Sequence, residues 1–304
     1  MPRKTSKEIL EELAAEDDGL TTRSIGTWTL EKLAVLLLYI RGFADACKSV
    51  GGVYVDGLAG PGLCAVDGAQ VEPRVVMGSP LIALATPELE HCYLLEKQEP
   101  ERSALEARAG KFGDRATVWS GDVNRDLSHL VREAVEPWRP CFCLLDPEAA
   151  ELHWDTIAAI ATTPRTKNKP ELLILFPLRM SIVRQFPTTG VLRPEARLRH
   201  NRTFGNLRWE PIYERRLSGA LSPGEANQEY LTLYRNGLEE LGYKYVFSKP
   251  ILAPRTARRG RQELYHLVFA SDDKTGDKIM TDVFKRHYDL GLISGGQMEL
   301  PIQA

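Results

Sequence analysis

The stretch Tyr54-Val55-Asp56-Gly57-Leu58-Ala59-Gly60-Pro61-Gly62 decides the fold of this chain of 304 residues. It joins a short apolar segment to a glycine-rich turn, and an aspartate stands just before the first glycine. Glycine lets the backbone turn tightly and approach a ligand closely. Because no Lys-Ser or Lys-Thr pair follows, the turn is not a phosphate-binding P-loop. We predict that the turn binds a ligand through Asp56, Gly57, Ala59, Gly60 and Gly62, and that the Asp56 carboxylate accepts hydrogen bonds from an ammonium group.

Four similar apolar segments follow the first one, and each ends at a polar, glycine or proline signal. The five predicted strands span residues 53–55, 92–95, 116–119, 141–145 and 172–176. They lack a clean alternation of apolar and polar residues, which is typical of strands buried on both faces. The predicted helices between them span residues 80–85, 99–111, 126–135 and 154–161. Strands that alternate with helices indicate a parallel, doubly wound sheet.

The two ends of the chain extend this core. Two helices are predicted before it, at residues 6–15 and from a Thr27 cap to Cys47. The elements predicted after it are a helix at 225–241, strands at 243–247 and 263–269, and a helix at 277–288. A short basic loop joins the last two strands, so they form an antiparallel hairpin, since a parallel crossover needs about a dozen residues or more.

Five parallel strands followed by such a hairpin are typical of class I S-adenosylmethionine-dependent methyltransferases. We therefore predict an α/β protein with a Rossmann-like, mostly parallel sheet of seven strands and a C-terminal antiparallel hairpin. The predicted parts are N-terminal helices at residues 1–50, which pack on the core, and a methyltransferase-like domain at 51–304. The domain carries an arginine-rich insertion at about 178–224.

The composition is that of a globular protein. Hydrophobic residues make up 43% of the chain and charged residues 26%, which excludes a disordered chain, a collagen and a small disulfide scaffold. The 39 basic and 41 acidic side chains nearly cancel, so the net charge indicates no partner. The apolar run at 34–40 is too short to cross a bilayer, and the N-terminus has no secretory h-region. We expect a cytoplasmic protein without membrane contact.

The five cysteines are an odd number without framework spacing, which favours reduced thiols. Cys141 and Cys143 should share one face of a strand and pack in the core. No second pair of cysteine or histidine residues has the spacing to complete a metal site with them. We predict no metal centre.

Acidic residues follow the second, third and fourth strands at the edge where ligands bind in an open parallel sheet. Glu96 is predicted to accept both hydroxyls of a ribose. Asp122, followed by Val123, is predicted to receive the amino group of an adenine, and the pair Asp146-Pro147 ends the fourth strand. Each carboxylate alone is equally well explained as a partner of a helix N-terminus. Together they predict one acidic crevice.

A dinucleotide-dependent dehydrogenase is the main alternative for such a sheet. Its ribose-binding acid is expected about 20 residues after the glycines. Glu96 lies much further along, because residues 63–77 are inserted first. Ser79 and Pro80 then resemble a helix N-cap and a proline in the first helical position. The inserted segment is either a lid over the cofactor or a surface loop without function.

These motifs together resemble the three-Cys-motif partner protein family, whose members resemble class I methyltransferases. The matching segments are residues 54–62, 78–81, 95–96, 121–124, 141–147, 204–205 with Trp209, 265–267 and 278–280. The resemblance implies an S-adenosylmethionine pocket, with the glycine turn beside the methionine part, Glu96 beside the ribose and Asp122 beside the adenine. It also implies a partner protein of the iron–sulfur radical type that carries three cysteines, since the cysteines of this chain do not form that motif.

The segment after Asp146-Pro147 departs from the family, which usually has an aromatic residue and a glycine where this chain has Glu148-Ala149. In enzymes that methylate amino groups of nucleic acids, an Asp-Pro-Pro-aromatic motif holds the amine and stacks the base. Only the first half of that motif is present, which weakens the case for base methylation. Glu148, Glu151 and His153 offer other acid–base groups, although His153 is better explained as a helix-start residue.

The insertion after the fifth strand is expected to be irregular and to overhang the crevice. From Arg179 to Arg216 it holds nine arginines and three glutamates. Arginine suits forked recognition of phosphate or carboxylate, and the aromatic residues among the arginines suit base stacking. We predict an anionic substrate held by Arg179, Arg184 and Trp209, which is a nucleic acid, a nucleotide or a carboxylated small molecule. The alternative is a solvated basic face whose arginines pair with the protein's own acids.

The leading hypothesis is an S-adenosylmethionine-dependent methyltransferase in which Asp146, with Pro147, orients or deprotonates the acceptor. Two alternatives stay open. One is a cofactor-binding accessory protein without methyl transfer, and the other is an aminocarboxypropyl transferase that uses the same cofactor.

Overall fold

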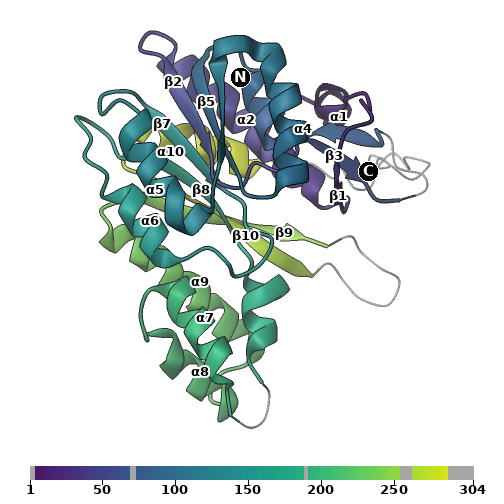
Figure 1. Cartoon of the computed structure of the whole chain (residues 1–304). Helices are drawn as coiled ribbons and strands as arrows, with labels where there is room; N and C mark the ends of the chain where they lie inside the picture. Colours follow the sequence, from purple (N-terminus) through teal and green to yellow (C-terminus); the bar gives the residue numbers. More distant parts are fainter. Residues whose placement is uncertain (1–3, 69–72, 188–190, 254–261, 287–304) are drawn as a thin grey trace, which may run out of the picture.

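Seven strands form the central sheet of the computed structural model, which describes residues 4–68, 73–187, 191–253 and 262–286. Their bounds are Gly52–Asp56 (β2), Leu89–Glu96 (β5), Ala116–Ser120 (β6), Cys141–Leu145 (β7), Glu171–Phe176 (β8), Tyr245–Leu252 (β9) and Glu263–Ser271 (β10). The order is β6-β5-β2-β7-β8-β10-β9 (Figure 1). The first five are parallel, whereas β10 pairs antiparallel with both β8 and β9. This order confirms the predicted class I methyltransferase fold and its C-terminal hairpin.

Helices cover both faces of this sheet. One face carries α2 (Thr29–Cys47), α3 (Ser79–Leu84), α4 (Glu99–Ala109) and α10 (Lys274–Lys285), and the other carries α5 (Val123–Ala134), α6 (Trp154–Ala161) and α9 (Pro223–Glu240). A short 3₁₀ segment, η1 (Gly110–Arg115), leads from α4 into β6. Successive strand residues point to opposite faces. Tyr54 and Phe142 therefore join the first cluster, and Val55 joins the second.

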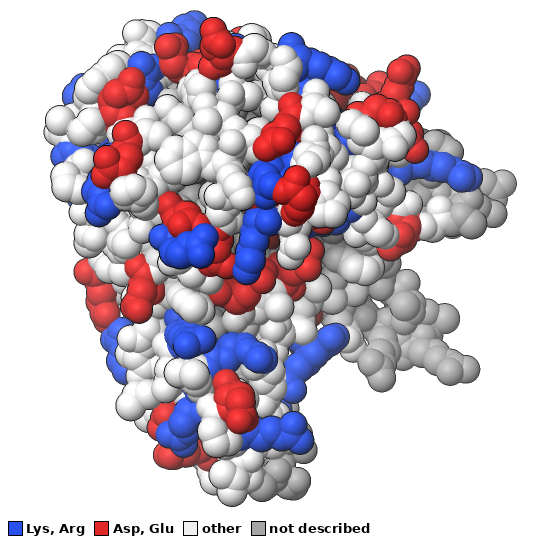
Figure 2. Space-filling model, in the orientation of Figure 1, with Lys and Arg blue, Asp and Glu red and all other residues white. Residues whose placement is uncertain are grey.

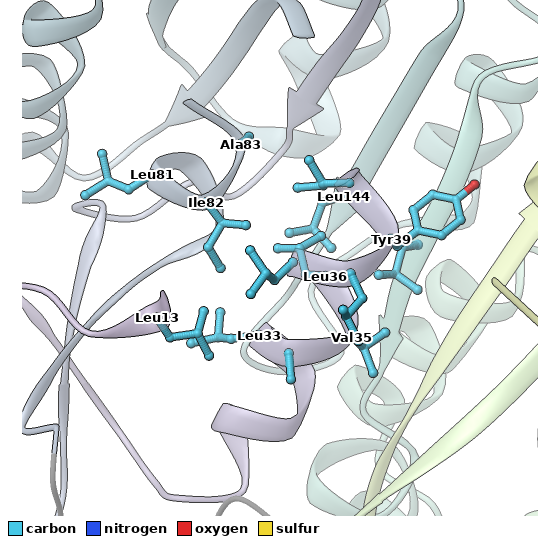
Figure 3. Packing of buried hydrophobic residues seen from close by; sticks show 14 of the residues in the cluster. Leu13, Leu33, Val35, Leu36, Tyr39, Leu81, Ile82, Ala83 and Leu144 are labelled. Atoms are coloured by element: carbon cyan, nitrogen blue, oxygen red, sulfur yellow. The ribbon is translucent and has the colours of Figure 1, made fainter. Parts of the chain in front are cut away.

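The helix α2 is the centre of the first cluster. Every residue from 33 to 40 is buried, and a helix that is apolar all round belongs in a core. Figure 3 shows Leu36 and Tyr39 of α2 close to Leu144 of β7, with Ile82 of α3 beside them. Leu13 of α1 (Ser6–Leu13) packs in the same cluster. The apolar run is thus a core helix, and no helix in the described part of the chain has the length and apolarity to cross a bilayer.

The inserted segment 63–77 contains two strands within its described residues. β3 (Leu63–Val66) pairs antiparallel with β4 (Val75–Met77) and parallel with β1 (Arg23–Ile25), so a second sheet of three strands lies beside the first. The register pairs Arg23 with Cys64. This pairing brings the segment before α2 to the edge of the glycine turn.

Two predicted helix caps were wrong by one residue. The N-cap of α2 is Trp28, because a turn from Gly26 already precedes it, with the amide of Thr29 donating to the Gly26 carbonyl at 3.0 Å. The N-cap of α3 is Gly78. Ser79 is its first helical residue, and the Ser79 side chain hydrogen-bonds Asp56 instead of capping the helix.

The arginine-rich insertion is helical, which corrects the expectation of an irregular stretch. It contains a π-helical turn η2 (Leu178–Ile182), a 3₁₀ turn η3 (Val183–Gln185), α7 (Pro194–Phe204) and α8 (Trp209–Leu217). With α9 these helices form the lower part of the molecule in Figure 1. A proline begins α7, and Gly205 ends it with φ 68°. Lys249, which was predicted in the basic hairpin loop, belongs to β9 instead. The four arginines predicted in that loop, at 255, 258, 259 and 261, and the end of the predicted helix 277–288 lie outside the described residues.

Cys141 and Cys143 are buried on the second face of β7, and their sulfur atoms are 3.7 Å apart. They pack in the core, as predicted from their spacing.

Candidate cofactor and acceptor site

The predicted crevice is a cavity of about 650 Å³ at the carboxyl ends of β2, β5, β6 and β7. We call it the acidic cavity, because Glu96, Asp122, Asp146 and Glu148 line it. Gly57 and Val123 also line it. The strand order reverses between β2 and β7, and the amide of Gly57 donates to the Leu144 carbonyl at 3.0 Å across this point. Ligands bind at such switch points.

Glu96 ends β5 and braces the glycine turn. One of its carboxylate oxygens accepts the amide of Gly60 at 2.8 Å, and the other accepts the amide of Gln98 at 2.7 Å. The residue is only 5% exposed, yet it borders the cavity. Each oxygen keeps capacity for another hydrogen bond from a ligand, since a carboxylate oxygen can accept more than one.

Asp122 is both the N-cap of α5 and a wall of the acidic cavity. Its side chain accepts the amide of Asn124 at 2.9 Å and pairs with the Lys97 ammonium at 3.0 Å. Partial burial alone would raise the pKa of Asp122, but these hydrogen bonds lower it. The carboxylate is therefore ionised at neutral pH. The helix-cap explanation and the ligand-binding prediction both fit this residue.

The glycine turn depends on backbone conformations that favour glycine. Gly60 has φ 65° and Gly62 has φ 94°. At Gly57, a Cβ atom would lie 2.7 Å from Leu127 of α5, so only glycine fits there without a shift. Ala59 is buried, and its amide donates to the Leu95 carbonyl at 3.0 Å. The turn is thus held against β5, with its backbone at the cavity edge.

Asp56 lies beneath the turn and is completely buried. The Tyr54 hydroxyl donates to it at 2.7 Å, and the amide of Leu58 donates at 3.3 Å. Burial raises the pKa of Asp56 to about 6, against the lowering effect of hydrogen bonds from Ser79 and Tyr54. The carboxylate contacts protein donors, and its predicted contact with a ligand's ammonium group stays a prediction.

A second cavity, of about 220 Å³, adjoins the first, and we call it the lysine cavity. Asp146 and Glu148 border both cavities, and Pro147 lines the second. The ammonium of Lys32, from the first turn of α2, forms an ion pair with Asp146, and both side chains are largely buried. Trp28 and Tyr265 also line the lysine cavity, together with Gly60 and Gly62 from the turn.

Lys32 and Arg23 were not predicted as site residues. Arg23 lines both cavities and pairs with Glu101 and, at 3.4 Å, with Glu148. A signal for Lys32 was present, because it is the one basic residue in the stretch of α2 before Arg41. Its partner lies 114 positions away in sequence, so the pairing itself had no local signal.

Of the other acid–base candidates, Glu148 and Glu151 line the acidic cavity and His153 does not. Glu148 is largely exposed and paired with Arg23, and Glu151 lines the acidic cavity. His153 is the N-cap residue of α6, and its amide donates to the Asn124 side chain at 2.8 Å. Burial and the nearby Arg202 lower the pKa of His153. These contacts support the helix-start explanation for this histidine.

Trp209 is a core residue of the insertion, which corrects the prediction that it stacks on a substrate. It is 0% exposed, and its indole N–H donates to the Asn201 side chain at 2.9 Å. The aromatic neighbours Phe186, Phe204 and Tyr213 are also buried. These rings pack together in the core of the helical insertion, so they are not available to stack on bases.

Several arginines of the insertion pair with the protein's own acids. The ion pairs are Arg197 with Glu210 at 2.7 Å, Arg208 with Glu240 at 2.6 Å and Arg215 with Glu229 at 2.8 Å. Figure 2 accordingly shows acidic side chains interspersed with basic ones over the lower part of the molecule. Arg179 and Arg184 lie elsewhere, beside a third cavity that shares only Met180 with the lysine cavity.

No protein-family model and no curated protein matches this chain. The solved METTL16 MTase domain aligns with 84% of this chain and 73% of its own, at 12% identity and a TM-score of 0.42. Precorrin-6y C5,15-methyltransferase from Geobacter metallireducens aligns with 85% of this chain and 92% of its own, at 13% identity and a TM-score of 0.38. M. jannaschii TYW2 in complex with AdoMet covers 75% of this chain and 72% of its own, at 10% identity and a TM-score of 0.33. These similarities concern the fold alone, and the resemblance to the three-Cys-motif partner family stays a prediction.

Proposed function

We propose that this chain is an S-adenosylmethionine-dependent methyltransferase. The observation that carries the proposal is the acidic cavity, in which Glu96, Asp122 and Asp146 line one space at the switch point of a class I sheet. Its volume of about 650 Å³ falls within the range of about 300–1,000 Å³ that is usual for ligand and cofactor sites. The sequence resemblance to the three-Cys-motif partner family points to the same cofactor.

The donors and acceptors of the acidic cavity fit an adenosine. Two ribose hydroxyls can donate to the free lone pairs of Glu96 without displacing the amides of Gly60 and Gln98. Asp122 offers an ionised acceptor for an adenine amino group, and Val123 offers an apolar contact for the ring. S-Adenosylmethionine, when bound, supplies a methyl group on a positively charged sulfonium.

Asp146 is our choice for the group that orients or deprotonates the acceptor. It borders the acidic cavity and the lysine cavity, so it lies where a cofactor and an acceptor would meet. Lys32 holds its carboxylate in place through their ion pair. Positioning of this kind brings reacting atoms to about 3–3.5 Å, from which much of an enzyme's rate enhancement derives. Pro147 shapes the acceptor side of the same wall.

The first experiment is calorimetric titration of S-adenosylmethionine and S-adenosylhomocysteine into the wild type, Glu96→Gln and Glu88→Gln. Loss of a hydrogen bond to a charged group costs about 1.5–3 kcal/mol, so we expect at least a tenfold loss of affinity in Glu96→Gln. Glu88 is exposed and precedes β5 at the opposite edge of the sheet, so Glu88→Gln is the matched control. Absence of binding to the wild type would contradict the proposal.

The second experiment follows a labelled methyl group into pools of nucleic acids and metabolites. Asp146→Ala should abolish transfer and leave the affinity for the cofactor largely intact, and full activity in that variant would exclude the proposed role. Cofactor binding without any transfer would favour an accessory protein. A product that carries an aminocarboxypropyl group in place of a methyl group would identify the third hypothesis by its mass.

The sequence resemblance also motivates a proposal about partners. We propose that the protein acts together with an iron–sulfur protein of the radical type that carries three cysteines. Copurification of such a protein with this chain, with the cofactor sites of both occupied, is the expected result.

A further inference from the structure

A third cavity, of about 360 Å³, lies between the insertion and the start of β10. We call it the arginine cavity, because Arg179, Arg184 and Arg216 line it, together with Met180 and Glu263. Arg179 and Arg184 belong to the short turns η2 and η3, and Arg216 belongs to the last turn of α8. The fold of the insertion thus brings three guanidinium groups to one hollow.

These three arginines lack partners within the described ranges. No side-chain hydrogen bond or ion pair joins Arg179, Arg184 or Arg216 to another described residue, in contrast to Arg197, Arg208 and Arg215, which pair with acids. The one carboxylate in the cavity belongs to Glu263, which is 3.6 Å from the His266 ring nitrogen. Three guanidinium groups therefore outnumber the acid, and the cavity carries surplus positive charge suited to an anion.

The arginine cavity adjoins the lysine cavity. Met180 lines both, and on β10 the neighbouring residues Leu264 and Tyr265 line the arginine cavity and the lysine cavity in turn. Asp146 and Pro147 also line the lysine cavity. A molecule anchored in the arginine cavity would therefore extend past Met180 toward Asp146.

The chemistry of the cavity favours a phosphate group. Arginine presents a planar fork of donors that matches phosphate oxygens. Convergence of three such forks suits a dianion, whereas a carboxylate carries one charge that a single arginine can satisfy.

The rest of the insertion favours a small molecule over a polynucleotide. Nucleic-acid grooves combine a continuous basic track with exposed aromatic rings. Here three of the outer arginines pair with Glu210, Glu240 and Glu229, and the rings of the insertion are buried. Three arginines without an acidic partner among the described residues line one hollow instead of a track with exposed rings.

We propose that the arginine cavity binds the phosphate group of a small phosphorylated acceptor and thereby directs the acceptor's other end to Asp146. The proposal of a phosphate site depends only on the cluster of Arg179, Arg184 and Arg216. The statement that its ligand is the acceptor rests on the proposed function.

The test is calorimetric titration of inorganic phosphate into the wild type, Arg179→Gln, Arg184→Gln and Arg216→Gln. We expect saturable binding to the wild type and about a tenfold or greater loss of affinity in each variant, since each removes charge-assisted hydrogen bonds. Arg215→Gln is the matched control, because Arg215 neighbours Arg216 but pairs with Glu229. Arg179 and Arg184 are exposed and unpaired within the described residues, so their replacement should leave the melting temperature unchanged.

Two results would overturn the phosphate site: absence of saturable phosphate binding to the wild type, or equal affinity in the cavity variants and in Arg215→Gln. A parallel titration uses a single-stranded RNA of 20 nucleotides. We would replace the small acceptor with a polynucleotide if the RNA bound, if its affinity fell steeply with salt, and if the three substitutions weakened it while phosphate did not inhibit it.

Titration of S-adenosylmethionine into the same variants separates this inference from the proposed function. We expect its affinity to be unchanged by the arginine substitutions. Phosphate binding without any cofactor binding would overturn the proposed function and leave the phosphate site standing. Cofactor binding with no phosphate binding would do the reverse.

Discussion

Replacement of Glu171 by glutamine tests the electrostatics of the core at the edge of the sheet opposite the crevice. Glu171 begins β8 and is only 5% exposed. The hydroxyls of Tyr39 and Ser271 donate to its carboxylate, the latter at 2.8 Å. Burial raises the pKa of Glu171 from 4.5 to about 7, against the lowering effect of these two hydrogen bonds. Asp273 and Asp272 add to the increase.

The sign of the effect follows from the proton balance. Between pH 4.5 and 7 the folded protein keeps the proton on Glu171, whereas the unfolded chain releases it. The free energy of unfolding therefore falls as the pH rises through this window. At about 1.4 kcal/mol for each pH unit between the two pKa values, the loss reaches about 3 kcal/mol by pH 8.

Glu171→Gln removes the titrating group and keeps an acceptor and donors for the two hydroxyls. We expect the variant to match the wild type near pH 4.5 and to exceed its unfolding free energy by about 3 kcal/mol at pH 8. Urea unfolding followed by circular dichroism from pH 4.5 to 8 measures the difference. Glu239→Gln, an exposed change on α9, is the control and should give no pH-dependent difference. A constant difference between Glu171→Gln and the wild type across this range would refute the reasoning.

Two further predictions concern the crevice. The affinity for S-adenosylmethionine should fall about tenfold from pH 7 to pH 5. The Asp56 carboxylate, which we predict to accept the ligand's ammonium group, has a pKa of about 6, so it is ionised above that pH and protonated below it. Calorimetry at several pH values checks this, and Asp56→Asn should give an affinity that does not change with pH. Lys32→Met should raise the affinity for S-adenosylmethionine relative to S-adenosylhomocysteine several-fold, because it removes a cation beside Asp146 and so favours the charged sulfonium. Equal changes for the two ligands would contradict the placement of the sulfonium near Lys32.

The central sheet was predictable because its signals are local. The predicted bounds 141–145 and 154–161 agree with β7 and α6 to the residue. Both segments consist largely of apolar side chains that are buried in the core, so their own sequence indicates the burial without knowledge of their neighbours in space. The carboxyl ends of parallel strands meet at one edge, so Glu96, Asp122 and Asp146 were expected to lie together, and they line the same cavity.

The rest of the site depends on contacts that have no local signal. β1 has three residues and no apolar pattern, and it becomes a strand only through its pairing with β3. Lys32 becomes a site residue only because α2 crosses the sheet beside the end of β7. The helices of the insertion did have a signal, since Pro194 and Gly205 mark the start and the end of α7. The excess of arginine in this segment favoured a prediction of substrate binding, but the helices pack around a core that contains Trp209.

The division between the two cavities indicates where the specificity of this protein resides. Glu96 and Asp122, at the carboxyl ends of strands in the central sheet, line the acidic cavity. We propose this cavity for the cofactor. Trp28 and Lys32 come from the segment before the sheet, and Met180 comes from the insertion, and these line the lysine cavity. The residue after Pro147 is the exposed Glu148, where the resembling family usually has an aromatic residue, so no ring is present at this position to stack on a base. Under the proposed function, we therefore expect groups beyond this strand end to act with Asp146 in recognition of the acceptor. We propose the three arginines of the arginine cavity, beyond Met180, for that role.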